Sequence, residues 1–201
     1  RMLECSYDTV CEVPRERWRS DVYPVTPEPI ASRVRHGGVV TGAALVVNGC
    51  FGISSAEAAA MDPQQRLLLE NGYDALHDRM VDCGTVAGAA ALVGVYVGIE
   101  IQDFMQVLVD GPPSVYLATG SSLSVASGRL SFALGLHAPC ATYVTACYAS
   151  LVGYQAARRG VQLGECQGAI ATGVNMMLLP GVSVALGMAG MTSASGRCHT
   201  F

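Results

Sequence analysis

Two short apolar segments flank a helical pattern near the middle of the chain, and this order restricts the fold more than any other feature. Residues 141–145 (ATYVT) and 169–173 (AIATG) consist of β-branched, aromatic and small residues and predict two buried strands. Between them, residues 148–159 predict a helix that ends at Gly160. Strand, helix and strand in this order form a right-handed crossover between parallel strands.

A third strand is predicted at residues 92–99 (LVGVYVGI), because this run is apolar throughout. Continuous apolar strands are typical of parallel sheets that helices cover on both faces. The composition agrees, since 51% of the residues are hydrophobic and 14% are charged, against about 25% charged residues in average globular chains. The sequence therefore predicts an ordered, layered α/β fold.

The clearest helix start is at Asp62, which can cap the helix while Pro63 occupies its first position. Gln65 stands where a capping box has its glutamine, and the helix is predicted to run to about residue 80. Residues 120–132 are rich in small side chains and predict another, tightly packed helix.

The chain has 201 residues, which fits one domain or most of one. Prolines at positions 14, 24, 27 and 29 interrupt the first part. We therefore expect a single partial domain over residues 1–201, with an irregular leading segment at 1–35 and an α/β core at 36–201.

Composition also narrows the kinds of partner. The net charge is −4 and no run of Lys and Arg forms a basic stripe, so nucleic acid is not expected as a partner. The eight cysteines form no C-x-x-C pair, which argues against a zinc site, and we expect them to be reduced and mostly buried. Residues 166–196 carry no charge, but their glycines and Pro180 favour a buried strand and loop over a membrane span.

Cys147 lies between the predicted strand at 141–145 and the helix that follows. A helix N-terminus carries partial positive charge and unpaired N–H groups, which favour a thiolate. The same N–H groups, including that of Cys147 itself, could donate to an oxyanion that forms after attack on a carbonyl. The alternative is that Cys147 is one buried cysteine among eight.

Several motifs occur in order along the chain. They are EVPRERW at 12–18, FGIS at 51–54, MDPQQRLLLE at 61–70, GVYVG at 94–98, TGSSLSVASGRLS at 119–131, GVN at 173–175 and GRCHTF at 196–201. Together they resemble the N-terminal half of the ketosynthase (β-ketoacyl synthase) domain of modular polyketide synthases and of related fatty-acid enzymes. So many ordered matches are far more specific than any one motif.

The nucleophile of that family lies in the pattern D-T-A-C-S-S-S. Cys147 matches its cysteine, and Thr145, Ala146 and Ser150 also match. Val144 replaces the acidic residue and Ala149 a serine, and Tyr148 places a bulky side chain beside the cysteine. The resemblance implies that Cys147 is the acyl nucleophile.

The resemblance implies the N-terminal half of a thiolase-like, layered αβαβα fold and a homodimer. It implies an acyltransferase that takes an acyl chain from the phosphopantetheine of an acyl carrier protein onto Cys147. Condensation with a decarboxylating malonyl-type thioester then yields a β-ketoacyl product for polyketide or fatty-acid synthesis. No bound cofactor or metal is implied, and the expected location is the cytoplasm, with an organelle such as the plastid as the alternative.

The two catalytic histidines of the family lie in later motifs, HGTGT and N-x-G-H, which do not occur in this sequence. His36, His77, His137 and His199 match no catalytic position, and we expect them to have structural or surface roles. These residues alone should accept an acyl group without completing condensation, and the C-terminal half of the ketosynthase is an expected partner.

Two alternatives remain. The first is a non-catalytic ketosynthase relative that acts as a structural or chain-length-modulating partner, which Val144 and Tyr148 favour. The second is a cysteine hydrolase, which would need His137 or His199 beside Cys147. A nicotinamide enzyme is weaker still, because no G-x-G-x-x-G fingerprint follows a strand.

Overall fold

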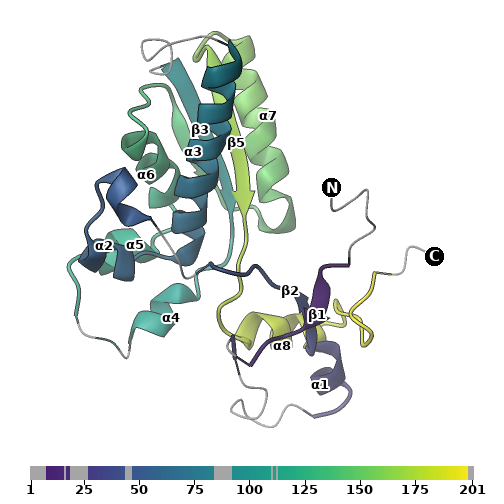
Figure 1. The fold of residues 1–201 in the computed structure, drawn as a ribbon. Helices are drawn as coiled ribbons and strands as arrows, with labels where there is room; N and C mark the ends of the chain where they lie inside the picture. The colour runs from purple at the N-terminus through teal and green to yellow at the C-terminus, as the bar shows by residue number, and fades with distance from the viewer. Residues whose placement is uncertain are drawn as a thin grey trace. The chain divides into compact units, whose positions relative to one another are not determined.

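A computed structural model describes residues 8–15, 17–18, 27–43, 47–83, 92–109, 111 and 113–198 (Figure 1). The chain divides into two compact units. One contains Arg1–Gly42 and Met177–Phe201, and the other contains Ala43–Met176.

The larger unit is built on a parallel three-stranded sheet with the order β4-β3-β5. The central strand β3 is Val93–Ile99, and its neighbours are β4, Cys140–Tyr143, and β5, Gly168–Val174. The ladder of β3 and β5 ends at the pair Ile99 and Val174. The three strands and their parallel arrangement confirm the prediction, but only β3 is buried, whereas β4 and β5 are partly exposed.

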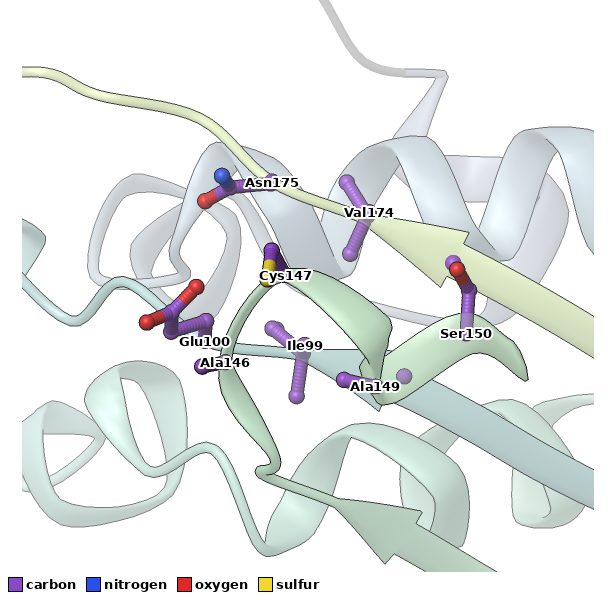
Figure 2. A pocket seen from close by; sticks show the side chains of 10 residues that line it. Ile99, Glu100, Ala146, Cys147, Ala149, Ser150, Val174 and Asn175 are labelled. Atoms are coloured by element: carbon purple, nitrogen blue, oxygen red, sulfur yellow. The ribbon is translucent and has the colours of Figure 1, made fainter. Parts of the chain in front are cut away.

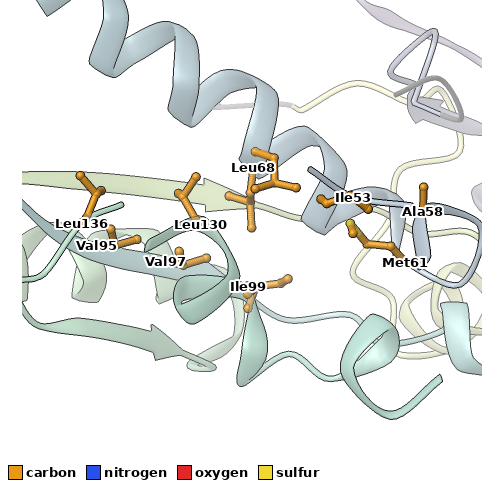
Figure 3. Packing of buried hydrophobic residues seen from close by; sticks show 11 residues of the cluster. Ile53, Ala58, Met61, Leu68, Val95, Val97, Ile99, Leu130 and Leu136 are labelled. Carbon is orange, nitrogen blue, oxygen red and sulfur yellow. The ribbon is translucent and has the colours of Figure 1, made fainter. Parts of the chain in front are cut away.

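Helices α3 (Pro63–Cys83) and α6 (Val125–Ala133) cover one face of this sheet. Successive side chains of a strand point to opposite faces, and on this face those of β3 after Val93 are buried in the main hydrophobic cluster. Leu68 of α3 and Leu130 of α6 belong to the same cluster (Figure 3). The residues of β3 in the cluster are Val95, Val97 and Ile99.

Helix α7 (Ala149–Gln162) packs on β3 and β5. The intervening residues of β3, Tyr96 and Gly98, approach it. The predicted end of this helix at Gly160 is wrong, because Gly160 lies within the helix against the hydroxyl of Tyr96, where a side chain would collide. The helix ends instead in a Schellman motif: Gly164 has φ +73°, and the N–H of Glu165 donates to Gly160 O over 3.0 Å.

The start of α3 confirms Asp62 as its cap, since Oδ1 of Asp62 accepts from the backbone N–H of Gln64 over 2.8 Å. The capping box is wrong. Gln65 instead donates to the carbonyl oxygens of Thr119, Gly120 and Ser122 at 3.0–3.2 Å. These carbonyls lie where the predicted helix at 120–132 breaks into α5 (Leu117–Ser121) and α6.

The remaining short elements of this unit join the strands and the longer helices. They are the 3-10 helices η1, Asn48–Phe51, and η3, Ala146–Tyr148, with helices α2, Ser55–Ala59, and α4, Phe104–Val109.

The smaller unit has an antiparallel pair of strands, β1 (Val10–Glu12) and β2 (His36–Gly38). Helix α1 (Ile30–Arg33) contacts α8 (Gly181–Met188), and Nη1 of Arg33 donates to Thr192 O over 3.2 Å. The described part of the leading segment is therefore less irregular than its prolines indicate. Within 166–196, the expected strand is β5, which is partly buried rather than buried, and the helix α8 lies in the part where a loop was expected.

The cysteines depart from prediction in burial. The structure describes six of them as free thiols, as expected, but only Cys166 is buried and the other five are exposed: Cys11, Cys50, Cys140, Cys147 and Cys198. Across the described ranges, no helix combines the length and apolar character needed to cross a bilayer.

Candidate active site

Cys147 lies in a tight elbow between β4 and α7. The backbone leaves the strand at Thr145 and turns at Ala146, which has φ +52°. Ala146 is the only non-glycine residue of the described chain with a positive φ. The left-handed region costs an L-residue roughly 1–2 kcal/mol, and such strain concentrates at functional sites.

The elbow rests on two glycines of the sheet. A Cβ added to Gly98 of β3 would overlap backbone atoms of Ala149 and Ser150, in the first turn of α7. A Cβ added to Gly173 of β5 would lie 2.5 Å from Cβ of Ser150. Glycine at both positions therefore lets the start of α7, and Cys147 before it, lie directly on the carboxyl ends of the strands.

A cavity of about 350 Å³ opens at these strand ends (Figure 2). Figure 2 shows Cys147 within it, with Glu100 and Asn175 projecting nearby. Glu100 follows β3 and Asn175 follows β5, so a carboxylate and an amide from adjacent strands line the same space as the thiol. The lining residues are Gly98, Ile99, Glu100, Ala146, Cys147, Ala149, Ser150, Gly173, Val174 and Asn175.

The electrostatic environment of the elbow comes mainly from α7. Tyr148 is the N-cap residue, and its side chain makes no capping hydrogen bond. The 14-residue helix begins at Ala149, two residues after Cys147, so its positive dipole end lies beside the cavity. A helix N-terminus of this kind can bind a negatively charged group.

One buried carboxyl group lies close to the same strand ends. Asp62 is 1% exposed, and burial raises the pKa of its carboxyl above the ordinary 3.8, against the lowering effect of hydrogen bonds from Gln64. In the part of the chain that the structure describes, no cluster of His, Cys, Asp and Glu side chains could hold a metal ion.

Of the three substitutions that distinguish this chain from the D-T-A-C-S-S-S pattern, Ala149 lines the cavity, and Val144 and Tyr148 lie away from it. Val144 is 54% exposed and Tyr148 is 55% exposed. Neither residue lines the cavity that contains Cys147. The bulky Tyr148 side chain therefore does not fill the space beside the thiol.

Within the larger unit, the structure does not bring His77 or His137 to Cys147. Neither residue lines the cavity, and His77 stacks on Tyr73 with ring centroids 5.7 Å apart. His36 lies in β2 of the smaller unit, and His137 is exposed before β4. His199 lies outside the described residues. The expected structural or surface roles fit the three described histidines.

Sequence analysis missed Glu100 and Asn175 as site residues. Each directly follows a parallel strand, and parallel strands place their carboxyl ends at one edge of the sheet, where ligands bind. That rule, applied to the predicted strands at 92–99 and 169–173, would have placed both residues near Cys147.

The geometry agrees with the comparisons to known proteins. The family model described as "Beta-ketoacyl synthase, N-terminal domain" matches residues 1–201. The chain belongs to the β-ketoacyl synthase family. The resemblance drawn from the ordered motifs is therefore confirmed.

The family's modular polyketide synthases include several close relatives of this chain. It is 40% identical over 199 residues to the polyketide synthase GfsB of Streptomyces halstedii. It is 38% identical over 201 residues to a mycocerosic acid synthase-like polyketide synthase of Mycolicibacterium smegmatis. Each match covers 96% of this chain but only 4% and 9% of the relative, so the chain spans less than a tenth of either protein.

Solved ketosynthases share the fold. The ketosynthase from module 6 of the bacillaene synthase of Bacillus subtilis matches with a TM-score of 0.80 and 28% identity. That match covers 98% of this chain and 32% of the solved chain. An oxazolomycin ketosynthase domain of Streptomyces albus gives a TM-score of 0.78 at 28% identity, over 96% of this chain and 34% of that one.

The thiolase-like, layered α/β fold is thus confirmed for this N-terminal half of a ketosynthase. Membership of the family also removes the main reason to consider an unrelated cysteine hydrolase. His137, one of the two histidines on which that alternative depended, does not line the cavity of Cys147.

Proposed function

We propose that Cys147 is the acyl-accepting nucleophile of a polyketide-type ketosynthase. The observation that carries this proposal is the position of Cys147 in a strained elbow, inside a cavity and beside the N-terminus of α7. Thiolate is the reactive form of cysteine, and the N-terminus of α7 provides partial positive charge and unpaired N–H groups beside Cys147.

The acyl-transfer step follows from this geometry. The Cys147 thiolate attacks the carbonyl carbon of an acyl thioester and forms a new C–S bond. The carbonyl oxygen becomes an oxyanion, and the backbone N–H of Cys147 is proposed as one of its donors. The old C–S bond then breaks, and the thiol of the phosphopantetheine leaves after taking up a proton, so the acyl group remains on Cys147.

The second stage completes the proposed function. A malonyl-type thioester loses carbon dioxide, and its carbanion attacks the thioester carbon on Cys147. The product is a β-ketoacyl thioester, and Cys147 returns as a thiolate. We propose that this stage uses an extender bound to a carrier protein. It also needs the C-terminal half of the ketosynthase, which contains the family's two later histidine motifs.

The wider setting is part of the same proposal. We propose that residues 1–201 form one partial domain, and the match of one family model to all of these residues supports this. Homodimerisation, an acyl carrier protein as donor and a cytoplasmic location remain predictions of the family resemblance. The non-catalytic alternative gains no support from Val144 and Tyr148, since neither lines the cavity.

Intact-mass measurement of the full natural chain after incubation with an acyl thioester tests the proposal. We expect wild type and a Cys140→Ala variant to gain one acyl mass, and Cys147→Ala to gain none. Cys140 is a matched control because it is also an exposed thiol on the same strand-to-helix segment. Equal labelling of Cys147→Ala would remove Cys147 as the acceptor.

A further inference from the structure

Gln64 is completely buried, and its side-chain amide has a partner for every polar hydrogen and for its oxygen. Nε2 donates to Ile101 O over 2.6 Å and to Oδ2 of Asp62 over 3.3 Å. Oε1 accepts from the backbone N–H of Met176 over 3.1 Å. A buried amide that is fully satisfied in this way holds its partners in one arrangement.

The two backbone partners of Gln64 lie just past the ends of adjacent strands. The ladder of β3 and β5 ends with Ile99 opposite Val174. Continued by two residues, the same register would place Ile101 opposite Met176. At this position the amide of Gln64 bridges the two chains, because it bonds both that carbonyl and that N–H.

This bridge lies beside the cavity of Cys147. Between the last ladder pair and the partners of Gln64 lie Glu100 and Asn175, which the same register would place opposite each other. Both line the cavity with Cys147 (Figure 2). The bridge made by Gln64 therefore lies one residue beyond each of these two lining residues.

We propose that Gln64 is a positioning residue of the ketosynthase site: its amide bridges the ends of β3 and β5 and so places Glu100 and Asn175 around Cys147. Gln64 does not line the cavity and acts only through these strand ends. The inference rests on the proposed function, because it concerns how an acyl thioester reaches Cys147 in a reactive orientation.

The next residue along the helix provides a matched control. Gln65 is 3% exposed and also uses its amide fully, but its partners are the carbonyls of residues 119, 120 and 122 and the guanidinium of Arg129. None of these residues lines the cavity. Gln65→Leu and Gln64→Leu therefore each remove a buried side-chain amide. The first amide lies away from the cavity, and the second bonds the strand ends beside it.

The experiment compares two rates at Cys147 in the full natural chain, both followed by peptide mass. One is acylation by hexanoyl-N-acetylcysteamine, which needs an oriented carbonyl, and the other is alkylation by iodoacetamide, a small probe. We expect both leucine variants to lower the unfolding temperature. Only Gln64→Leu should lower the ratio of acylation to alkylation, by about a hundredfold for a misplacement of about 1 Å.

Gln64→Glu keeps the test valid if Gln64→Leu does not fold. A protonated glutamic acid can still donate to Ile101 O and accept from Met176, whereas its ionised form cannot donate. The ratio of acylation to alkylation, relative to wild type, should therefore rise as the pH falls. A ratio that is independent of pH would overturn the positioning role.

The outcomes separate the two proposals. If wild type is acylated at Cys147 and the rate ratio is unchanged in Gln64→Leu, or falls equally in Gln65→Leu, the positioning role is overturned and the proposed function stands. If wild type takes no acyl group at Cys147, the proposed function fails, and the positioning role fails with it.

Discussion

Gly98→Ala should disturb the site more than the size of one methyl group indicates. The added Cβ would lie 2.5 Å from the carbonyl carbon of Ala149 and 2.6 Å from Cα of Ser150, and closer still to the Ser150 nitrogen. Ordinary contacts of this kind are 3.4–4 Å. All three neighbours are backbone atoms, so the first turn of α7 must move by about 1 Å rather than a side chain turning aside.

The expected magnitude has two parts. Overpacking of this kind costs about 1–3 kcal/mol of unfolding free energy, which corresponds to roughly 2–4 °C in the unfolding temperature for each kcal/mol in a domain of this size. A displacement of about 1 Å at Cys147 lowers the rate of acylation by about a hundredfold. Calorimetry gives the first quantity, and intact-mass kinetics with an acyl thioester gives the second.

Gly168→Ala is the matched control for this prediction. Gly168 is also a strand glycine of the sheet, but an added Cβ would meet only Cγ2 of Val93 at 4.0 Å, an ordinary contact. It should leave both the unfolding temperature and the acylation rate close to wild type. Wild-type acylation and stability in Gly98→Ala would refute the argument that α7 is seated on this glycine.

Two further predictions concern the elbow and the buried acid. Ala146→Gly should raise the free energy of unfolding by up to about 1 kcal/mol, because glycine adopts the φ of +52° without strain; a lower unfolding temperature than wild type would contradict this. For Asp62, burial raises the folded-state pKa above the ordinary 3.8, so its contribution to stability is fully present below the unfolded pKa and is lost as the pH rises through the folded pKa. Urea unfolding at a series of pH values gives the free energy of unfolding of wild type and of Asp62→Asn. The wild-type value relative to that of Asp62→Asn should therefore fall as the pH rises. A relative value that grows with pH would mean that folding lowers the pKa of Asp62 instead.

Local patterns were sufficient to predict the sheet. The run at 92–99 is apolar along its whole length, and the segments on either side of the Cys147 helix are rich in β-branched and small residues, so each predicts a strand without knowledge of distant residues. The elbow followed from the same order of elements, because a strand and a helix separated by two residues leave room only for a tight turn.

Features that depend on contacts between distant residues could not be predicted in this way. Gly160 continues α7 because Tyr96, more than sixty positions earlier, occupies the space beside it. Gln65 forms no capping box because its side chain donates instead to carbonyl oxygens at the end of α5, which need donors. The bonds of Gln64 to Ile101 and Met176 join residues 37 and 112 positions away along the chain.

The most direct test of the central claim is to locate the acyl group by fragmentation mass spectrometry. Trypsin cleaves after Arg129 and Arg158, and the peptide between them contains both Cys140 and Cys147. After incubation of the full natural chain with an acyl thioester, the account predicts that the acyl mass lies on fragments that contain Cys147 and is absent from those that contain only Cys140. An acyl group on Cys140, or an unmodified Cys147 at saturating thioester, would contradict it.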